Sequence, residues 1–391
     1  MASKNPSRSF QNYCSSCNRY KEVVERLLEG TGIKINGNNP WDIQIYYDEF
    51  YERVLTHGTL GLGESYIDGW WKCVSIDQLV ERLLKANIKE KVDKDGSSFK
   101  FSLFFDYLKS KLTNPQNIKR AFNIGEKHYD LGNDLFYYML DNRMIYSCGY
   151  WKDADNLDKA QESKLELICK KINLERGMRI LDIGCGFGGF LKYASEKYLI
   201  SGVGVTISKE QKKLADERCK NLPIEIKLED YRELNEKFDR IISIGMFEHV
   251  GYKNYRTYME KVNSLLKENG LFLLHTIGKD KIGGGDKFIN KYIFPNSYIP
   301  TSNEITKSFE KLFVMEDWHN FGADYDKTLI AWNKNFQNNW CRFKDKYSDR
   351  FKRMWEYYLL SCAGTFRARK QQLWQIVLSK EGIVGGYNQI R

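Results

Sequence analysis

The chain has 391 residues, more than one typical domain needs, and it can bury a sizeable hydrophobic core. A hydrophobic content of 42% excludes extensive disorder, and a formal net charge of +10 favours an anionic partner, either nucleic acid or an anionic membrane. No apolar run approaches the roughly 20 residues that span a bilayer, and residues 1–6 are polar, without a signal-peptide core. We therefore expect a cytoplasmic protein that is at most peripheral to a membrane.

The nine cysteines are interpreted as reduced thiols, because their number is odd and they are scattered along the chain. Cys14 and Cys17 form a C-x-x-C pair, but no second pair at zinc-site spacing follows, so no metal site is expected. Cys185 lies among glycines, where we expect a small packing residue rather than a nucleophile.

Residues 1–90 are predicted to form a smaller α+β module. Helices are expected over 20–29 and 76–84, and short strands over 33–35 and 43–46. The charged segment 89–100 contains Gly96 and two serines and is the best linker candidate. We assign the linker to 91–116 and a second, larger domain to 117–391.

A glycine-rich turn begins the core of the second domain. The apolar run 179–183 stops at Gly184, Gly186, Gly188 and Gly189, and a helix-compatible segment follows. Glycines are needed where the backbone must approach a ligand without a Cβ in the way. A dinucleotide site would also need an acidic residue about 20 positions on, at the end of the second strand. The second strand, 202–205, ends without a carboxylate, so a different nucleoside is indicated.

Further strands are expected over 224–228, 238–244 and 270–274, with a helix over 255–267 that Asn269 and Gly270 close. The resulting alternation of strands and helices predicts an α/β, Rossmann-like domain. Its order is similar to that of class I S-adenosylmethionine-dependent methyltransferases. A different cofactor on a Rossmann-type fold is the alternative.

The aromatic-rich tail carries nine basic residues against three acidic ones over 342–370, a net charge of +6. Five of its residues recur at helical spacing: Tyr347, Phe351, Trp355, Tyr358 and Cys362. A stripe of this kind is more often part of a core. The functional alternative is an apolar slot for an acyl chain, with a charged flank that meets lipid phosphates.

Seven separated motifs resemble the cyclopropane-fatty-acyl-phospholipid synthases, of the mycolic acid cyclopropane synthase family. The motifs are GEKHYDLGND at 125–134, MIYSCGYW at 144–151, LDIGCGFGG at 181–189, GMFEHVG at 245–251, LLHTIG at 273–278, DWHNFGADY at 317–325 and CAGTFRAR at 362–369. The sequence GLGESYIDGWW at 61–71 extends the likeness into the first module. The chain departs from the family at Phe187, where a tryptophan is frequent, and in the glycine run 283–285.

This resemblance implies transfer of a methylene group from S-adenosylmethionine to the cis double bond of an unsaturated phospholipid acyl chain. It also implies that a bound bicarbonate is the general base, held by Glu248, His275 and Tyr325 and by backbone groups of Cys148 and Ile277. Attack of the double bond on the methyl group would leave a carbocation on the acyl chain, and Tyr325 is our first choice among the aromatic residues that could stabilise it. Cys362 matches a cysteine often named as catalytic, but an alkene attacks the methyl directly, so we expect Cys362 to line the lipid pocket.

The family's cofactor-binding pattern maps onto four segments of the chain. Gln211 is expected to contact the ribose hydroxyls, and Asp230 and Tyr231 to lie at the adenine edge. The full set is Tyr146, Ser147, Ile180, Leu181, Asp182, Ile183, Gly184, Cys185, Gly186, Phe187, Gly188, Thr206, Gln211, Asp230, Tyr231 and Arg232.

The implied partner is an unsaturated phospholipid in a bilayer, of anionic character, reached by peripheral contact with the inner face of the cell membrane. A homodimer is implied by analogy, and nucleic acid is not expected as a partner. Two alternatives remain open. The same fold gives a methyl-branched or methylene-containing chain instead of a ring, or the protein is a basic lipid- or RNA-binding protein with a vestigial cofactor fold.

Overall fold

The computed structural model describes residues 7–88 and 132–391, which divide into two compact units. Unit 1 comprises the described residues up to 88 together with Asp286–Ile293 and Lys344–Ala368. Unit 2 comprises 132–285, Phe294–Phe343 and Arg369–Arg391. Two segments that the sequence analysis assigned to the second domain therefore belong to unit 1. The predicted linker, most of the motif at 125–134, and the side chains of Cys14 and Cys17 lie outside the described part of the chain.

Unit 1 is mainly helical. Its elements are α1 (Ser7–Leu28), β1 (Gln44–Ile45), α2 (Glu49–His57), α3 (Thr59–Ile67), β2 (Trp71–Lys72), α4 (Ile76–Lys85), α13 (Lys287–Tyr292) and α16 (Asp349–Arg367). The helix expected over 76–84 is confirmed, whereas α1 begins well before residue 20. The strand expected over 33–35 is wrong, because only an isolated bridge joins Ile35 to Ile43. None of the described helices has the length and apolar character of a membrane span.

The stripe of the tail lies on α16 from Phe351 onward, whereas Tyr347 precedes the helix, and the stripe contributes to the core of unit 1. Trp355 and Tyr358 are buried, and their rings pack edge to face with centroids 5.2 Å apart. Gly364 lets α16 approach α4 closely, because a Cβ at this position would clash with the carbonyl of Asp77. For Trp355 and Tyr358, the interpretation of the stripe as core is confirmed.

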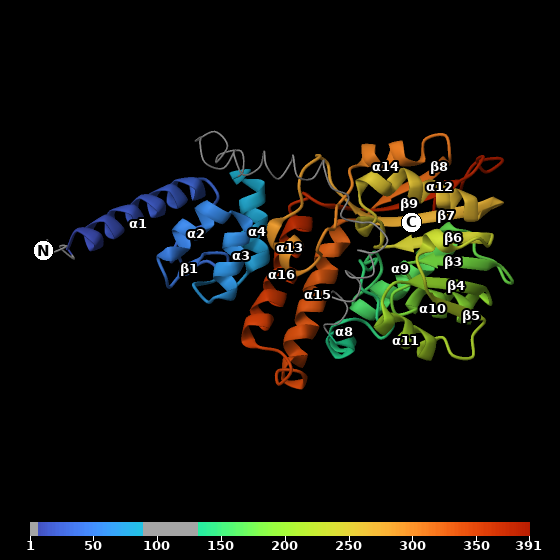
Figure 1. The fold of residues 1–391 in the computed structure, drawn as a ribbon, viewed down its shortest axis with the longest axis horizontal. Helices are drawn as coiled ribbons and strands as arrows, with labels where there is room; N and C mark the ends of the chain where they lie inside the picture. The colour runs from blue at the N-terminus through green and yellow to red at the C-terminus, as the bar shows by residue number, and fades with distance from the viewer. Residues whose placement is uncertain (1–6, 89–131) are drawn as a thin grey trace, which may run out of the picture. The chain divides into compact units, whose positions relative to one another are not determined.

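Unit 2 is built on a seven-stranded sheet with the order β5-β4-β3-β6-β7-β9-β8 (Figure 1). Its strands are β3 (Arg179–Ile183), β4 (Ser201–Thr206), β5 (Ile224–Leu228), β6 (Phe238–Ile244), β7 (Leu266–Gly278), β8 (Val314–Asn320) and β9 (Gln372–Ser379). The first five strands pair in parallel, and β9 runs antiparallel between β7 and β8. The α/β, Rossmann-like prediction is confirmed. Because β3 has β4 on one side and β6 on the other, the strand order reverses here, which is where such sheets bind ligands.

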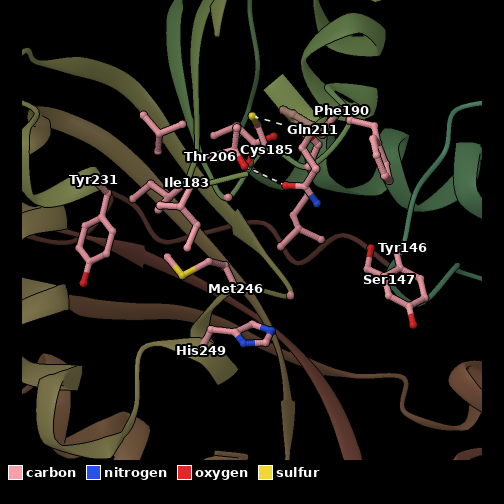
Figure 2. Close-up of a pocket in the computed structure, with 18 of the residues that line it drawn as sticks. Tyr146, Ser147, Ile183, Cys185, Phe190, Thr206, Gln211, Tyr231, Met246 and His249 are labelled. Carbon is pink, nitrogen blue, oxygen red and sulfur yellow. Dashed lines mark hydrogen bonds between the residues drawn. The ribbon is translucent and has the colours of Figure 1, made fainter. Parts of the chain in front are cut away.

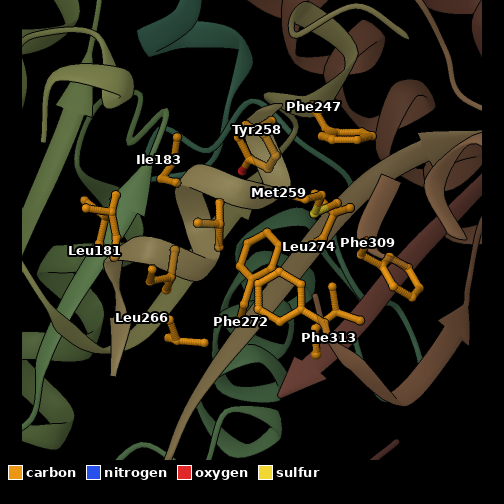
Figure 3. Packing of buried hydrophobic residues seen from close by; sticks show 14 of the residues in the cluster. Leu181, Ile183, Phe247, Tyr258, Met259, Leu266, Phe272, Leu274, Phe309 and Phe313 are labelled. Carbon is orange, nitrogen blue, oxygen red and sulfur yellow. The ribbon is translucent and has the colours of Figure 1, made fainter. Parts of the chain in front are cut away.

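Helices cover both faces of this sheet. The helices of unit 2 are α8 (Asn133–Met139), α9 (Leu157–Lys171), α10 (Gly189–Tyr198), α11 (Lys209–Arg218), α12 (Tyr255–Leu265), α14 (Ser302–Phe309) and α15 (Ala323–Asn339). Side chains of α12 and α14 pack with Leu181 and Ile183 in the buried cluster drawn in Figure 3. Ile180, on the opposite face of β3, packs with α9 and α10 in a second cluster. The period-two alternation of β3 therefore separates the two hydrophobic layers.

One predicted boundary is wrong. The expected helix 255–267 ends at Leu265, and β7 begins at Leu266 rather than at Gly270. Asn269 and Gly270 lie inside the strand, where the register with β6 jumps from Phe238–Leu266 to Arg240–Leu271. Leu266 is fully buried. Burial of this side chain in the sheet therefore outweighs the local turn signal.

Candidate active site

The glycine-rich turn joins the carboxyl end of β3 to the N-terminus of α10. Gly184, Gly186 and Gly188 all have positive φ, at 83°, 54° and 75°, which glycine adopts without strain. A Cβ on Gly184 would crowd the side chain of Met246, whereas a Cβ on Gly186 would meet no described atom within 4 Å. The backbone at Gly186 is therefore open to a ligand. Cys185 is buried in a core cluster, as expected of a packing residue.

A pocket opens beside this turn, over the carboxyl ends of β3, β4, β5 and β6 (Figure 2). Thirteen of the sixteen predicted cofactor residues line it: Tyr146, Ser147, Asp182, Ile183, Gly184, Cys185, Gly186, Phe187, Thr206, Gln211, Asp230, Tyr231 and Arg232. Ile180, Leu181 and Gly188 do not line it. Ile180 and Leu181 point into the two core layers, and Gly188 is the N-cap of α10, in a left-handed conformation. As cofactor contacts, these three residues stay predictions.

Two predicted polar contacts are already paired within the protein. The Thr206 hydroxyl donates to Gln211 Oε1 at 2.8 Å, the bond drawn as a dashed line in Figure 2. The nitrogen of the Gln211 amide is then the atom left to donate to a ligand hydroxyl. Arg232 binds both carboxylate oxygens of Asp230, through Nε at 2.8 Å and Nη2 at 2.6 Å. Asp230 thus reaches the pocket as half of an ion pair.

Lys164, on α9, is a pocket residue that the sequence analysis missed. Its side chain is fully buried, and Nζ donates to Ser147 Oγ at 2.8 Å. Burial lowers the pKa of Lys164 to about 8, partly opposed by the charges of Asp141 and Asp182. Burial also raises the pKa of Asp182 to about 7, against the charge of Lys164. The sequence feature that could have indicated this residue is its position, because Lys164 is a charged residue next to the buried apolar residues Leu165 and Ile168 of α9.

Two further pocket residues, Met246 and His249, also went unpredicted as cofactor contacts. Both come from the segment after β6, and His249 lies next to Glu248 in a short 3₁₀ turn, Phe247–His249. Burial lowers the pKa of His249 to about 4, so its imidazole is neutral. The signal was their place in the motif at 245–251, which the sequence analysis used only for Glu248.

The five residues predicted to hold bicarbonate gather at the ends of β6 and β7. The backbone nitrogen of Ile277 donates to Glu248 Oε1 at 2.6 Å. Ile277 and Tyr325 pack against a small buried cluster that contains Cys148 and Phe321. The His275 ring lies with its centroid 5.9 Å from that of Phe321. We call these five residues, Glu248, His275, Tyr325, Cys148 and Ile277, the cage.

Two buried polar atoms of the cage have no hydrogen-bond partner among the residues that the structure describes. They are Glu248 Oε2 and His275 Nε2. Burial raises the pKa of Glu248 to about 7, partly opposed by the Ile277 N–H. Burial, followed by the charges of Lys164 and Lys171, holds the pKa of His275 well below its usual range. Such atoms are costly unless a ligand or water satisfies them, so the cage fits a small ligand that both donates and accepts hydrogen bonds.

The donor set of the pocket also fits S-adenosylmethionine. Asp182 Oδ1 is buried without a hydrogen-bond partner in the described ranges, and an ammonium group would satisfy it. Gln211 offers an amide nitrogen for a ribose, and Gly186 leaves space at the backbone. The cage and the pocket come from neighbouring positions, since Glu248 and the pocket residue His249 are consecutive.

Cys362 lies in α16 of unit 1, away in sequence from the elements of the cage. Burial raises the pKa of its thiol to about 12, so the thiolate needed for nucleophilic attack is scarce. This agrees with a non-nucleophilic role. The expectation that Cys362 lines a lipid pocket stays a prediction.

Comparison with known proteins supports the motifs. The family model for mycolic acid cyclopropane synthetase matches residues 116–376. The cyclopropane-fatty-acyl-phospholipid synthase of Escherichia coli K12 is 53% identical over 368 residues, which is 93% of this chain and 94% of that protein. A probable fatty acid methyltransferase of Pseudomonas putida is 35% identical, over 65% of this chain and 68% of that protein.

A solved structure agrees with these relatives. The mycolic acid cyclopropane synthase CmaA1, complexed with SAH and CTAB, matches with a TM-score of 0.63 and 30% identity, over 66% of this chain and 98% of that one. The predicted resemblance is confirmed, and it favours an enzyme over a vestigial binding protein. The chain therefore belongs to the mycolic acid cyclopropane synthetase family, and it is an enzyme of the S-adenosylmethionine-dependent methyltransferase type.

Proposed function

We propose that the protein converts cis double bonds in unsaturated phospholipid acyl chains into cyclopropane rings. The E. coli relative named for this reaction spans 93% of the chain, so the likeness includes unit 1 as well as the catalytic sheet. The related CmaA1 structure holds SAH together with CTAB, a long-chain detergent. That pairing supports a site that takes a nucleoside donor and a hydrocarbon chain.

The observation that carries this proposal is the pair of unpartnered buried atoms in the cage, Glu248 Oε2 and His275 Nε2. An acceptor and an imidazole nitrogen are thereby left for one small ligand, within a site walled by Tyr325 and Phe321. Bicarbonate offers a proton to Glu248 and oxygens to His275. We therefore propose bicarbonate as the ligand and as the general base.

The two bound groups would supply an electrophilic methyl and a proton-accepting oxyanion. The protein's own residues do the rest. Glu248, which accepts from the Ile277 N–H, and His275 hold the oxyanion. The Tyr325 hydroxyl and the backbone at Cys148 complete its shell, and buried aromatic side chains exclude water. Aromatic faces such as Tyr325 stabilise the positive charge on the substrate chain by about 0.5–2 kcal/mol each.

We also propose peripheral contact with the inner face of the cell membrane, and a homodimer. The net charge of +10 supports an anionic lipid surface. Within unit 1, Tyr46, Tyr47 and Val74 are exposed, and amphipathic tyrosines are common where proteins meet the membrane–water interface. Unit 1 is the part of the chain that we assign to lipid association.

The test is incubation with S-adenosylmethionine and vesicles of cis-unsaturated phospholipid, with bicarbonate and anionic lipid varied. We expect cyclopropane ring protons in the NMR spectrum of the product, more product with bicarbonate, and faster turnover with anionic lipid. Absence of any modified acyl chain under all these conditions would overturn the proposal.

A second candidate is methyl transfer without ring closure, which the likeness to a probable fatty acid methyltransferase favours. A methylene-containing product has the same added mass as the ring, so mass alone does not separate the two. NMR does, because ring protons are absent from the methyl-branched and methylene-containing chains.

A further inference from the structure

Three polar side chains form a row across the antiparallel edge of the sheet. The strand register places Gln375 of β9 opposite His275 of β7 on one side and opposite His319 of β8 on the other. Residues paired in this way point to the same face. Gln375 is fully buried and His275 is 1% exposed, so water does not mediate their contact. Gln375 has no role in the family motifs of the sequence.

Gln375 Nε2 lies 3.3 Å from His275 Nδ1. An amide nitrogen can only donate, so His275 Nδ1 accepts this bond, and the single proton of a neutral ring lies on Nε2. The opposite amide orientation would leave both N–H donors of Gln375 unpaired, whereas the present orientation pairs at least one of them and leaves the carbonyl Oε1 unpaired, which is better tolerated than an unpaired N–H. The ring is neutral, because burial and the charges of Lys164 and Lys171 hold the pKa of His275 well below its usual range.

We propose that Gln375 is a positioning residue that holds His275 as the Nε2–H tautomer, so that the imidazole presents a donor to the cage. Nε2 is the atom that lacks a hydrogen-bond partner within the described ranges. His275 then binds an oxyanion and does not take a proton from the substrate. The catalytic meaning of this assignment rests on the proposed function, whereas the tautomer itself does not.

The second histidine of the row is held in the same manner. Lys171 Nζ lies 3.1 Å from His319 Nδ1, and an ammonium group can only donate. Lys171 is in turn paired with Asp317 at 3.2 Å, and Arg391 binds both oxygens of Asp317 at 2.6 Å. A donor thus faces Nδ1 of each histidine. Lys171 donates to His319 of β8, so Gln375 is left to donate to His275.

The tautomer is measured directly by ¹⁵N NMR on protein labelled only at histidine, without lipid or bicarbonate. The chain has five histidines, and His275→Gln identifies the relevant signals. We expect a protonated Nε2 and an unprotonated Nδ1 for His275 in the wild type. A protonated Nδ1 would overturn the inference whatever the protein's activity.

Variants of Gln375 test its part in this arrangement. Gln375→Glu replaces the donor by an acceptor, and we expect a proton to appear on His275 Nδ1. Gln372→Glu makes the same change on the opposite face of β9, where Gln372 Oε1 accepts from Asn320, and should leave the His275 signals unchanged. Unchanged His275 signals in Gln375→Glu would also overturn the inference.

The kinetic readout uses Gln375→Met, which has similar volume and no donor. We expect the bicarbonate concentration that gives half-maximal activity to rise about tenfold, which corresponds to the free energy of one hydrogen bond to a charged group. The affinity for S-adenosylmethionine should be retained. Equal loss of affinity for both would indicate a merely structural role for Gln375. If bicarbonate has no effect on the wild type, the proposed base fails, but the tautomer measurement still decides the inference.

Discussion

The pocket and the cage differ in how their polar groups are satisfied. In the pocket, Thr206 is bonded to Gln211, and Arg232 to Asp230, before any ligand binds. In the cage, Glu248 and His275 each keep one buried atom without a partner in the described part of the chain. The pocket is therefore largely preorganised, although Asp182 Oδ1 is also buried there without a partner in the described ranges, whereas both Glu248 and His275 of the cage leave an atom for a small ligand.

Substitution of Glu248 by glutamine gives the largest effect that separates the two regions. Glu248→Gln should lower kcat by about 10²–10⁴-fold, because general-base catalysis contributes on that scale. Since Glu248 belongs to the cage, the affinity for S-adenosylmethionine should stay within about twofold. Turnover assays and calorimetric titration measure the two quantities. If kcat and the affinity for S-adenosylmethionine fell together, Glu248 would have a structural role, and the distinction between the cage and the pocket would fail.

Substitution of Lys164 by methionine tests the pocket. The change removes the positive charge that opposes the raised pKa of Asp182 and leaves Ser147 Oγ without its donor, and we expect a loss of about 1–3 kcal/mol in the free energy of unfolding. Because Ser147 lines the pocket, S-adenosylmethionine affinity should also fall about tenfold. Denaturant unfolding and titration calorimetry give the two values.

Lys171→Met is the matched control for Lys164. Lys171 lies on the same helix, is equally buried, and pairs with Asp317, but it does not line the pocket. It should lose similar stability and keep its affinity for S-adenosylmethionine. Equal weakening of binding in both variants would mean that Lys164 acts only through the fold.

The pH dependence of stability sharpens the description of the cage. Folding raises the pKa of Glu248 from 4.5 to about 7, so the folded state binds more protons between these values. The contribution of Glu248 to stability is therefore present below pH 4.5 and is lost as the pH rises through 7. Glu248→Gln should thus be more stable than the wild type at pH 8, by at most about 3 kcal/mol, and similar near pH 4. Thermal unfolding of both proteins at pH 4 and pH 8 measures this difference in stability. A stability gain of Glu248→Gln that is larger at pH 4 than at pH 8 would contradict the raised pKa of Glu248.

Cys362→Ala is expected to have the smallest effect. The pKa of this thiol is raised to about 12, so a covalent role is disfavoured, and the variant should keep most of its turnover. The assay is turnover together with a check of folding and cofactor binding. Complete loss of turnover in a folded, cofactor-binding variant would show that a thiol outside the cage is chemically required.

The pocket could be predicted from the sequence because its geometry is local. The glycines at 184–188 determine the turn within a single strand–helix connection. Each strand of the parallel part of the sheet also has a short apolar run that can be recognised in the sequence. Lys164 was missed because nothing in one sequence tells whether a charged residue on an apolar stripe is buried. Leu266 was placed in a helix because its burial in the sheet is a tertiary effect.

The cage could be predicted only through the family resemblance. Its residues lie more than 170 positions apart, from Cys148 to Tyr325, and no local pattern brings them together. The strands β8 and β9 were not predicted, and without them the pairing of Gln375 with His275 has no signal in the sequence. Long-range strand pairing, rather than propensity, decides this part of the molecule.

The insertion of β9 between β7 and β8 has a consequence for biosynthesis. Every glycine of the nucleoside-binding turn leaves the ribosome long before residues 372–379, which supply the hydrogen-bonding partner for both flanking strands. A nascent chain stalled before this point could form the donor's half of the site, yet β8 would have no neighbour and His275 no amide beside it. The ability to bind the methyl donor should therefore arise earlier during translation than catalytic activity.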